Sequence, residues 1–252
     1  MAFNHVPQRV KIGCGIPCTP WCSWGAHNLS TTESSRIVLN STVHIYHEEW
    51  NETTLQNDIG LIGLPENVTL NEYIGTVNLA RGSETYANEI GIILGWGLTE
   101  TGGVSSTLRH VNVTVQTNQE CSNYYGSTII DTHICTSGSG IVGSCGGDSG
   151  GPLIVDGVQV GIVSFGTGDC TLGYPSVFAR INSYSDWLAQ YVSDCPNLQY
   201  SFFVLAAACL LQLLVSLSCF RNVVYMNARK EPVILKIIPK YFVYSTCALC
   251  FS

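Results

Sequence analysis

The sequence is poor in charged residues, which make up only 12% of its 252 residues. Basic side chains are the scarcer kind, with 11 lysines and arginines against 18 acidic residues and a net charge of −7. Proteins that bind nucleic acids need a basic surface to neutralise phosphates, so this composition argues against a nucleic-acid partner. With 46% apolar residues, the chain can still form one or two domains with a sizeable core.

A signal peptide is also missing from the start of the sequence. Residues 1–22 contain several polar and charged side chains and no apolar core of the usual length. Other features favour the secretory route, because 12 cysteines are too many for an ordinary cytosolic domain. Five N-glycosylation sequons point the same way, at Asn28, Asn40, Asn51, Asn67 and Asn112. We therefore expect a secreted glycoprotein.

Helical periodicity is scarce, and no internal repeat is present. Only the segment 182–192 has apolar residues near one face of a helix, with Tyr184, Leu188 and Tyr191 among them. Alternation with a period of two is commoner, as in Val111, Val113 and Val115. Many short strands with glycine-rich turns predict an all-β barrel or sandwich. Further expected strands are Ile90–Leu94, Leu153–Val155, Val158–Phe165 and Ser176–Ile181, the middle two joined by an Asp156-Gly157 hairpin turn.

The chain divides by composition into three zones. Residues 1–24 are short, contain proline and cysteine, and show no clear period. Residues 25–193 carry the strand patterns and form the expected domain. Residues 194–252 form a tail that is first apolar and then basic and mixed.

The strongest signal for chemistry is the run Gly146-Gly147-Asp148-Ser149-Gly150-Gly151-Pro152. Acyl transfer to a serine needs a hydroxyl on a tight exposed turn and N–H donors that face the developing oxyanion. Glycines permit the unusual dihedral angles and close approach of such a turn. Ser149 is therefore the candidate nucleophile, and the N–H groups of Gly147 and Ser149 are the candidate oxyanion hole.

This run resembles the active-site signature of the chymotrypsin/trypsin family of serine proteases. Four further segments, in family order, are similar to family motifs: Asn57–Ile62, Gly95–Gly97, Val163–Gly166 and Tyr174–Arg180, followed by Trp187 in a C-terminal helix. The resemblance covers residues 25–193. It implies two antiparallel β-barrels with the active site between them, the first barrel here incomplete. It also implies a monomeric endopeptidase that cleaves proteins or peptides without a cofactor.

By this resemblance, Asp58 is the carboxylate that orients the catalytic histidine. The family carries that histidine in a Thr-Ala-Ala-His-Cys motif, which is absent here. His27 resembles a later, non-catalytic family histidine, and its step to Asp58 is too short for the catalytic pair. The remaining histidines are no better placed: His5, His44, His47, His110 and His133. The chain is then a truncated or mis-spliced product, a gene-model error, or a non-catalytic relative that acts as a binding module.

The resemblance has a second missing part, the new N-terminus whose amine pairs in the family with the acid before the serine. That acid is Asp148 here, and a buried carboxylate without a partner is costly. We therefore expect Asp148 to lack a partner and the oxyanion loop to be distorted.

The resemblance also implies the disulfides Cys121–Cys135 and Cys145–Cys170. In its specificity pocket, Gly143 would form the floor, and Gly166 and Ser176 would form the walls. A neutral position at Gly143, where trypsin-like enzymes carry aspartate, favours aromatic or large aliphatic substrate side chains. The likeness is greatest to chymotrypsin-like and collagenolytic digestive enzymes of arthropods.

A metal site is not expected. Cys14, Cys18 and Cys22 are four residues apart, which would place them on one face of a helix. Pro17 and Pro20 lie between them and disfavour a regular helix.

In the tail, residues 202–220 form a mainly apolar run that is long enough to span a bilayer. Basic residues follow the run, which would place the tail's end in the cytoplasm and the protease domain outside. The equally weighted alternative is that this tail, like residues 1–24, is translated non-coding sequence. Membrane anchoring through residues 202–220 therefore stays an open alternative to secretion.

Overall fold

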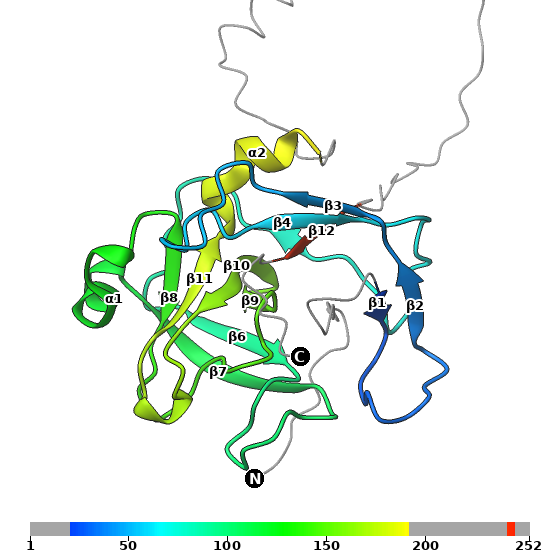
Figure 1. Ribbon diagram of the computed structural model, residues 1–252, viewed down its shortest axis with the longest axis horizontal. Coiled ribbons are helices and arrows are strands. Elements are labelled where there is room, and N and C mark those ends of the chain that lie inside the picture. Colours follow the sequence, from blue (N-terminus) through cyan, green and yellow to red (C-terminus); the bar gives the residue numbers. More distant parts are fainter. Residues whose placement is uncertain (1–20, 192–240, 245–252) are drawn as a thin grey trace, which may run out of the picture. The chain divides into compact units, whose positions relative to one another are not determined.

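The computed structural model describes residues 21–191 and 241–244 (Figure 1). Strands dominate the described chain, and its helices are short. The sheets divide the described chain into two regions. The first region consists of residues 21–80 together with the strand at 241–244. The second, which is called the barrel region, contains the strands between residues 90 and 180.

Six antiparallel strands of the barrel region close on themselves. They are β6 (Ile90–Gly95), β7 (Arg109–Gln116), β8 (His133–Thr136), β9 (Pro152–Val155), β10 (Val158–Phe165) and β11 (Ser176–Arg180). Around the barrel the order is β6, β7, β8, β11, β10, β9 and again β6. Closure satisfies the backbone groups on both sides of every strand, so these strands have no free edge.

The strand predictions in this region are confirmed. In β7 the alternation places Val113 and Val115 in the core, while Asn112 and Thr114 are exposed. Asp156 and Gly157 both have positive φ, 46° and 77°, as the turn of a tight hairpin between β9 and β10 requires. The buried cluster at the centre receives side chains from all six strands.

Residues 21–80 are organised differently. β1 (Trp21–Trp24) and β2 (Ile37–Asn40) form a two-stranded sheet. β3 (Val43–Tyr46), β4 (Gly60–Gly63) and β12 (Tyr241–Tyr244) form a three-stranded sheet with β4 in the middle. The short β5 (Asn78–Leu79) pairs in parallel with the start of β10. Apart from β5, the described strands of this region thus form two small sheets and not a closed barrel.

The prediction of a single C-terminal helix was incomplete, because α1 (Asn118–Tyr125) precedes β8. Its only buried residue is Cys121, so it has no apolar stripe that periodicity could reveal. A capping box between Thr117 and Glu120 starts it, and this Thr-x-x-Glu pattern was the available signal. Three short 3₁₀ turns also occur, at Gly126–Thr128 (η1), Cys170–Leu172 (η2) and Ile181–Tyr184 (η3).

The predicted helix over 182–192 is shorter than expected. It begins with η3, and its α-helical part, α2, covers only Ser185–Ala189. β11 accordingly ends at Arg180, one residue before the predicted limit. The predicted inward face is correct, because Tyr184 and Leu188 are both buried.

Several sequence predictions lie outside the described residues. These are the apolar run 202–220, the remainder of the tail apart from β12, and the cysteines Cys14 and Cys18. Within residues 21–191 and 241–244, no helix has the length and apolar character needed to cross a membrane. In the same residues, no group of histidine, cysteine and acidic side chains has the makings of a metal site.

Candidate active site

Ser149 lies on a compact turn between β8 and β9. The turn is closed by two hydrogen bonds, from the Asp148 N–H to the Cys145 carbonyl (3.0 Å) and from the Gly151 N–H to the Asp148 carbonyl (2.8 Å). Gly147 and Gly150 have φ of 95° and 80°, values that a side chain would strain. The glycines of the run are therefore required by the backbone that presents Ser149.

The same turn is fastened to β10. The Gly150 N–H donates to the Val163 carbonyl (2.9 Å), and the Val163 N–H donates to the Gly151 carbonyl (2.8 Å). None of the hydrogen bonds found between described residues uses the N–H of Gly147 or of Ser149. Both groups are thus available to a ligand, as an oxyanion hole requires.

The expectation that Asp148 lacks a partner is wrong. Its carboxylate accepts hydrogen bonds from the backbone N–H groups of Gly97 (2.8 Å) and Cys145 (3.0 Å). Burial raises the pKa of Asp148, and the two N–H donors oppose that rise. A Cβ atom on Gly97 would lie 2.5 Å from this carboxyl group, and one on Gly95 would also overlap it. The segment Gly95-Trp96-Gly97 is therefore shaped by its contact with Asp148.

Asp58 is buried, with 1% of its surface exposed, at the position two residues before β4. Its Oδ2 accepts a hydrogen bond from the Ser164 hydroxyl at 2.5 Å. Ser164 lies in β10, next to Val163, which holds the Ser149 turn. One strand of the barrel thereby anchors both Asp58 and the turn of Ser149, although these two residues are 91 positions apart in the chain (149 − 58).

Of the three residues proposed for the specificity pocket, Gly143 and Ser176 lie close together, and Gly166 lies beside Pro175, the residue before Ser176. The Ser176 hydroxyl accepts a hydrogen bond from the Ser144 N–H (2.9 Å), and a Cβ atom on Gly143 would lie 2.7 Å from that hydroxyl. A Cβ atom on Gly166 would meet only the Pro175 carbonyl, at 3.9 Å. A Cβ atom at position 166 would therefore make only an ordinary contact, whereas the hydroxyl of Ser176 limits the side chain that can stand at position 143.

Asp169 follows the pocket residue Gly166 in the chain, and its carboxylate is bound by a residue of its own loop. Its carboxylate accepts hydrogen bonds from the Thr171 N–H (2.9 Å) and the Thr171 hydroxyl (2.6 Å), which caps η2. These bonds lower the pKa of Asp169. The carboxylate is thus committed to its own loop.

The described residues contain two disulfides, and they are the two that the resemblance implies. Cys121–Cys135 joins α1 to β8, with a Cα–Cα distance of 6.3 Å. Cys145–Cys170 joins the Ser149 turn to η2, with a Cα–Cα distance of 5.8 Å. The second disulfide thus links the turn of the candidate nucleophile to the segment that begins η2.

The histidines in residues 21–191 have local roles. His27 is exposed, and its main chain binds Glu33, Trp96 and Leu108. His44 and His110 are exposed strand residues, in β3 and β7 respectively.

Two histidines are packed against the protein. The ring of His47 lies on Trp187, with centroids 5.2 Å apart, and its Nδ1 accepts from the Glu49 N–H. His133 is fully buried, and both of its ring nitrogens are bonded to backbone groups. Sequence reasoning did not foresee the burial of His133 or the contact of Ser164 with Asp58, because neither follows from a local pattern.

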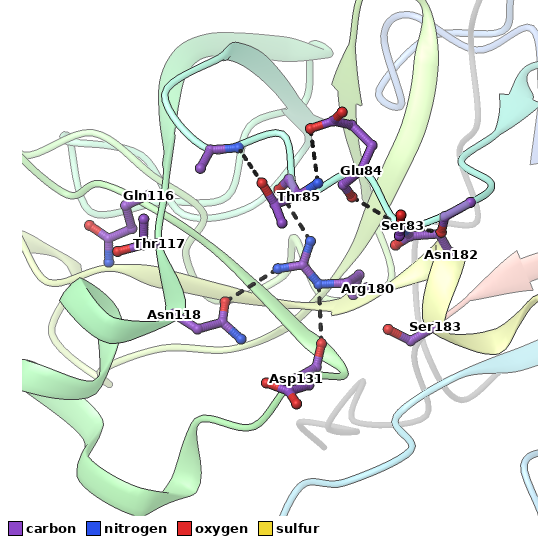
Figure 2. A pocket seen from close by; sticks show the side chains of 12 residues that line it. Ser83, Glu84, Thr85, Gln116, Thr117, Asn118, Asp131, Arg180, Asn182 and Ser183 are labelled. Atoms are coloured by element: carbon purple, nitrogen blue, oxygen red, sulfur yellow. Dashed lines mark hydrogen bonds between the residues drawn. The ribbon is translucent and has the colours of Figure 1, made fainter.

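A cavity of about 400 Å³ lies around Arg180, and neither Ser149 nor Asp58 lines it (Figure 2). The Arg180 guanidinium donates to the carbonyls of Thr85, Asp131 and His133 and to the Asn118 side chain. Asn182 donates to the carbonyls of Gly82 and Glu84. These bonds tie the loop at residues 82–85 to the barrel, so the cavity is a structural junction.

Several known proteins are similar to this chain in sequence. The family described as Trypsin matches residues 19–188. A brachyurin from Leptuca pugilator is 38% identical over 68% of this chain and 76% of its own length. A chymotrypsin from Phaedon cochleariae is 39% identical over 65% and 60%, and trypsin I-P1 from Gallus gallus is 37% identical over 68% and 69%. The chain thus spans 60–76% of the length of these relatives.

Solved structures agree with the sequence relatives. The structure of GrC shares 32% identity and a TM-score of 0.63, covering 68% of this chain and 76% of the other. The structure of HL collagenase shares 27% identity and a TM-score of 0.60, covering 69% and 83%. The closed six-stranded barrel with few helices is therefore part of a trypsin-like fold, and the chain belongs to the trypsin family of chymotrypsin-like serine proteases.

Proposed function

We propose that the chain carries the site of a chymotrypsin-like serine endopeptidase, with Ser149 as nucleophile and Asp58 as the carboxylate that orients the base. The N–H groups of Gly147 and Ser149 form the oxyanion hole in this proposal. The observation that carries it is the double anchoring on β10. Val163 fixes the turn of Ser149, and Ser164 fixes the buried Asp58. Preorganised groups of this kind stabilise a developing oxyanion without reorganisation.

The proposed substrates are proteins or peptides with aromatic or large aliphatic side chains at the cleaved residue. The pocket positions Gly143, Gly166 and Ser176 bear no charge. The carboxylate of the neighbouring Asp169 is held by Thr171. A cationic lysine or arginine would lack a partner in such a pocket, and burying it there would be costly.

A second candidate function is binding without catalysis. Acyl transfer needs a general base, which is normally histidine because its pKa lies near working pH. The ring of His47 packs on Trp187, and both ring nitrogens of His133 are bonded to backbone groups. His27 resembles a non-catalytic position of the family. A domain that kept the substrate cleft but received no base from its own chain would act as a binding module for peptides.

Labelling with a fluorophosphonate probe distinguishes the two candidates. An endopeptidase site should label rapidly, and labelling should disappear in Ser149→Ala while the variant keeps its fold. Rapid labelling that depends on Ser149 would exclude the non-catalytic module, because an unassisted serine is a poor nucleophile. Labelling no faster than that of an ordinary serine, with a peptide inhibitor still bound, would favour the binding module.

The preference for apolar substrates has its own test. Peptide esters with phenylalanine, leucine, arginine or lysine at the cleaved residue should acylate Ser149 in that approximate order. Faster acylation by the arginine or lysine esters would contradict the neutral pocket. A matched variant, Gly143→Asp, should shift the order toward the cationic esters, at the cost of displacing the Ser176 hydroxyl.

We also propose a monomeric protease domain that lies outside the cell, either secreted or anchored through residues 202–220. In this proposal the strands of residues 21–80 represent the incomplete first barrel. Carbonate extraction of membranes tests the anchor: an anchored protein stays in the pellet, whereas release into the supernatant contradicts anchoring.

A further inference from the structure

His133 is a buried histidine for which the proposed reaction has no use. It begins β8, and only 1% of its surface is exposed. Its Nδ1 receives a hydrogen bond from the Ile130 N–H at 3.3 Å, and its Nε2 lies 3.3 Å from the Leu55 carbonyl oxygen. An N–H can only donate and a carbonyl can only accept, so both bonds form together only in the neutral ring that carries its hydrogen on Nε2.

The Leu55 contact holds the segment that leads into Asp58. Leu55 and Asn57 both adopt positive φ, 57° and 58°, which is unfavourable for residues with a Cβ atom. Such backbone persists only where surrounding contacts fix it. The Asn57 side chain donates to the Glu49 carbonyl (3.0 Å), and His133 supplies a contact from the barrel.

The other side of the His133 ring contacts the strand that binds Asp58. Its ring meets that of Phe165 edge to face, with centroids 5.5 Å apart. Phe165 directly follows Ser164, whose hydroxyl donates to Asp58. His133 therefore contacts Leu55, which lies shortly before Asp58, and Phe165, which directly follows Ser164.

We propose that His133 is a positioning residue for Asp58, which it serves only as the neutral ring with hydrogen on Nε2. By binding the Leu55 carbonyl and packing on Phe165, it fixes the backbone before Asp58 against β10. This inference rests on the proposed role of Asp58 as the orienting carboxylate. The contact itself requires no chemistry at Ser149.

A dependence on pH follows from this arrangement. Protonation of Nδ1 would set an N–H against the Ile130 N–H and place a charge in a buried site. Two charged groups face the ring, Asp58, which favours the protonated form, and Arg180, which opposes it. Burial outweighs both and lowers the pKa of His133. The unfolded chain therefore takes up this proton first, and stability is full above a pH of about 6.5 and falls as the pH drops below that value.

Long-range proton–nitrogen NMR of the full chain, with labelled histidine, tests the ring state directly. We expect the spectrum of His133 to show hydrogen on Nε2, and this state should persist below a pH of about 6.5, the ordinary pKa of a histidine side chain. A ring with hydrogen on Nδ1, or one that titrates at or above a pH of about 6.5, would overturn the proposal.

A matched pair of variants separates positioning from general stability. In His133→Gln the side-chain NH₂ can still reach the Leu55 carbonyl, whereas in His133→Asn the shorter side chain replaces only the acceptor for the Ile130 N–H. Hydrogen exchange of amides 57–60 should accelerate about tenfold or more in the Asn variant and stay near the native rate in the Gln variant. Amides of β6 and β7 should change equally little in both.

Equal acceleration across β6, β7 and residues 57–60 would show a purely structural role and contradict positioning. Unchanged exchange at residues 57–60 in His133→Asn would contradict it as well. If that variant does not fold, the NMR titration and the Gln variant still decide the question. None of these measurements uses Ser149, so a negative labelling result would refute the proposed endopeptidase function without changing their outcome.

Discussion

The barrel region and residues 21–80 solve the problem of strand pairing in different ways. In the barrel region every strand from β6 to β11 has a partner on both sides, and all six contribute to one buried cluster. In residues 21–80 the strands other than β5 form two small sheets, and the separate cluster around Trp24, Ile62 and Ile74 is much smaller. Three buried residues of this region, Ile59, Leu61 and Ala80, join the barrel cluster instead. A closed barrel supplies rigid positions, whereas small sheets rely on contacts with neighbouring segments.

The candidate active site is divided between these two regions. Ser149, the oxyanion donors and the pocket residues belong to the barrel region, while Asp58 comes from the loop before β4. Asp58 is held in place by groups of the barrel region, above all Ser164. A region of small sheets can thus supply a precisely placed carboxylate when a closed barrel holds that carboxylate.

Shortening one buried leucine to alanine in each cluster should give the largest difference in stability between the two regions. Leu153→Ala opens a cavity in the fully buried barrel core and should lower the free energy of unfolding by ~3–5 kcal/mol. Leu64→Ala acts on the smaller cluster, where neighbours can collapse into the space, and should cost about 2 kcal/mol. Denaturant unfolding of both variants measures the pair. A larger loss from Leu64→Ala would reverse the comparison.

Removing a disulfide should have the next largest effect. The replacements Cys145→Ser and Cys170→Ser together should cost about 3 kcal/mol, because the loop that the disulfide closes gains freedom in the unfolded state. They should also slow labelling of Ser149, since Cys145 begins the nucleophile turn. The control pair, Cys121→Ser with Cys135→Ser, should cost a similar amount of stability and leave labelling unchanged. If Ser149 were labelled at the same rate in both double variants, the Cys145–Cys170 disulfide would not be needed to hold the turn of Ser149.

Adding a methyl group at Gly97 should cost less stability, and its main effect should be on the turn of Ser149. Gly97→Ala places a Cβ atom 2.5 Å from the Asp148 carboxyl group and should cost ~1–3 kcal/mol through overpacking. Labelling of Ser149 should fall at the same time, because Asp148 helps to hold the turn. Gly103→Ala is the control, since nothing lies within 4 Å of its added Cβ atom. Unaltered labelling in Gly97→Ala would show that Asp148 does not set the turn.

Glycosylation should have the smallest effect on stability. Asn112 and Thr114 of one sequon are both exposed on β7 of the barrel. A chain made in a secretory host should therefore lose mass on treatment with an N-glycosidase, and Asn112→Gln should remove part of that loss. The same variant should change the free energy of unfolding by no more than about 0.5 kcal/mol, as expected for an exposed site. No mass change from Asn112→Gln would show that this sequon is unused.

Much of the barrel region could be predicted from local patterns. The alternation in β7, the Asp-Gly turn and the glycine run around Ser149 each reflect a local rule of backbone geometry. α1 was missed because its side chains are mostly exposed and polar, so only its capping box marks it. The length of α2 was overestimated because the first residues of the periodic segment form a 3₁₀ turn. Periodicity identifies a buried face, but it does not decide how tightly the chain winds.

The sequence by itself determined the strand pattern, the nucleophile turn and, through family resemblance, the roles expected of Ser149 and Asp58. Only the tertiary structure decided what stands next to them. It brought Ser164 to Asp58, Gly97 to Asp148, and His133 to the backbone at Leu55. These contacts join residues 51 to 106 positions apart, and such pairings depend on how strands meet in space. A local pattern records which face of a segment is buried, whereas the partner on that face is fixed by the packing of the whole barrel.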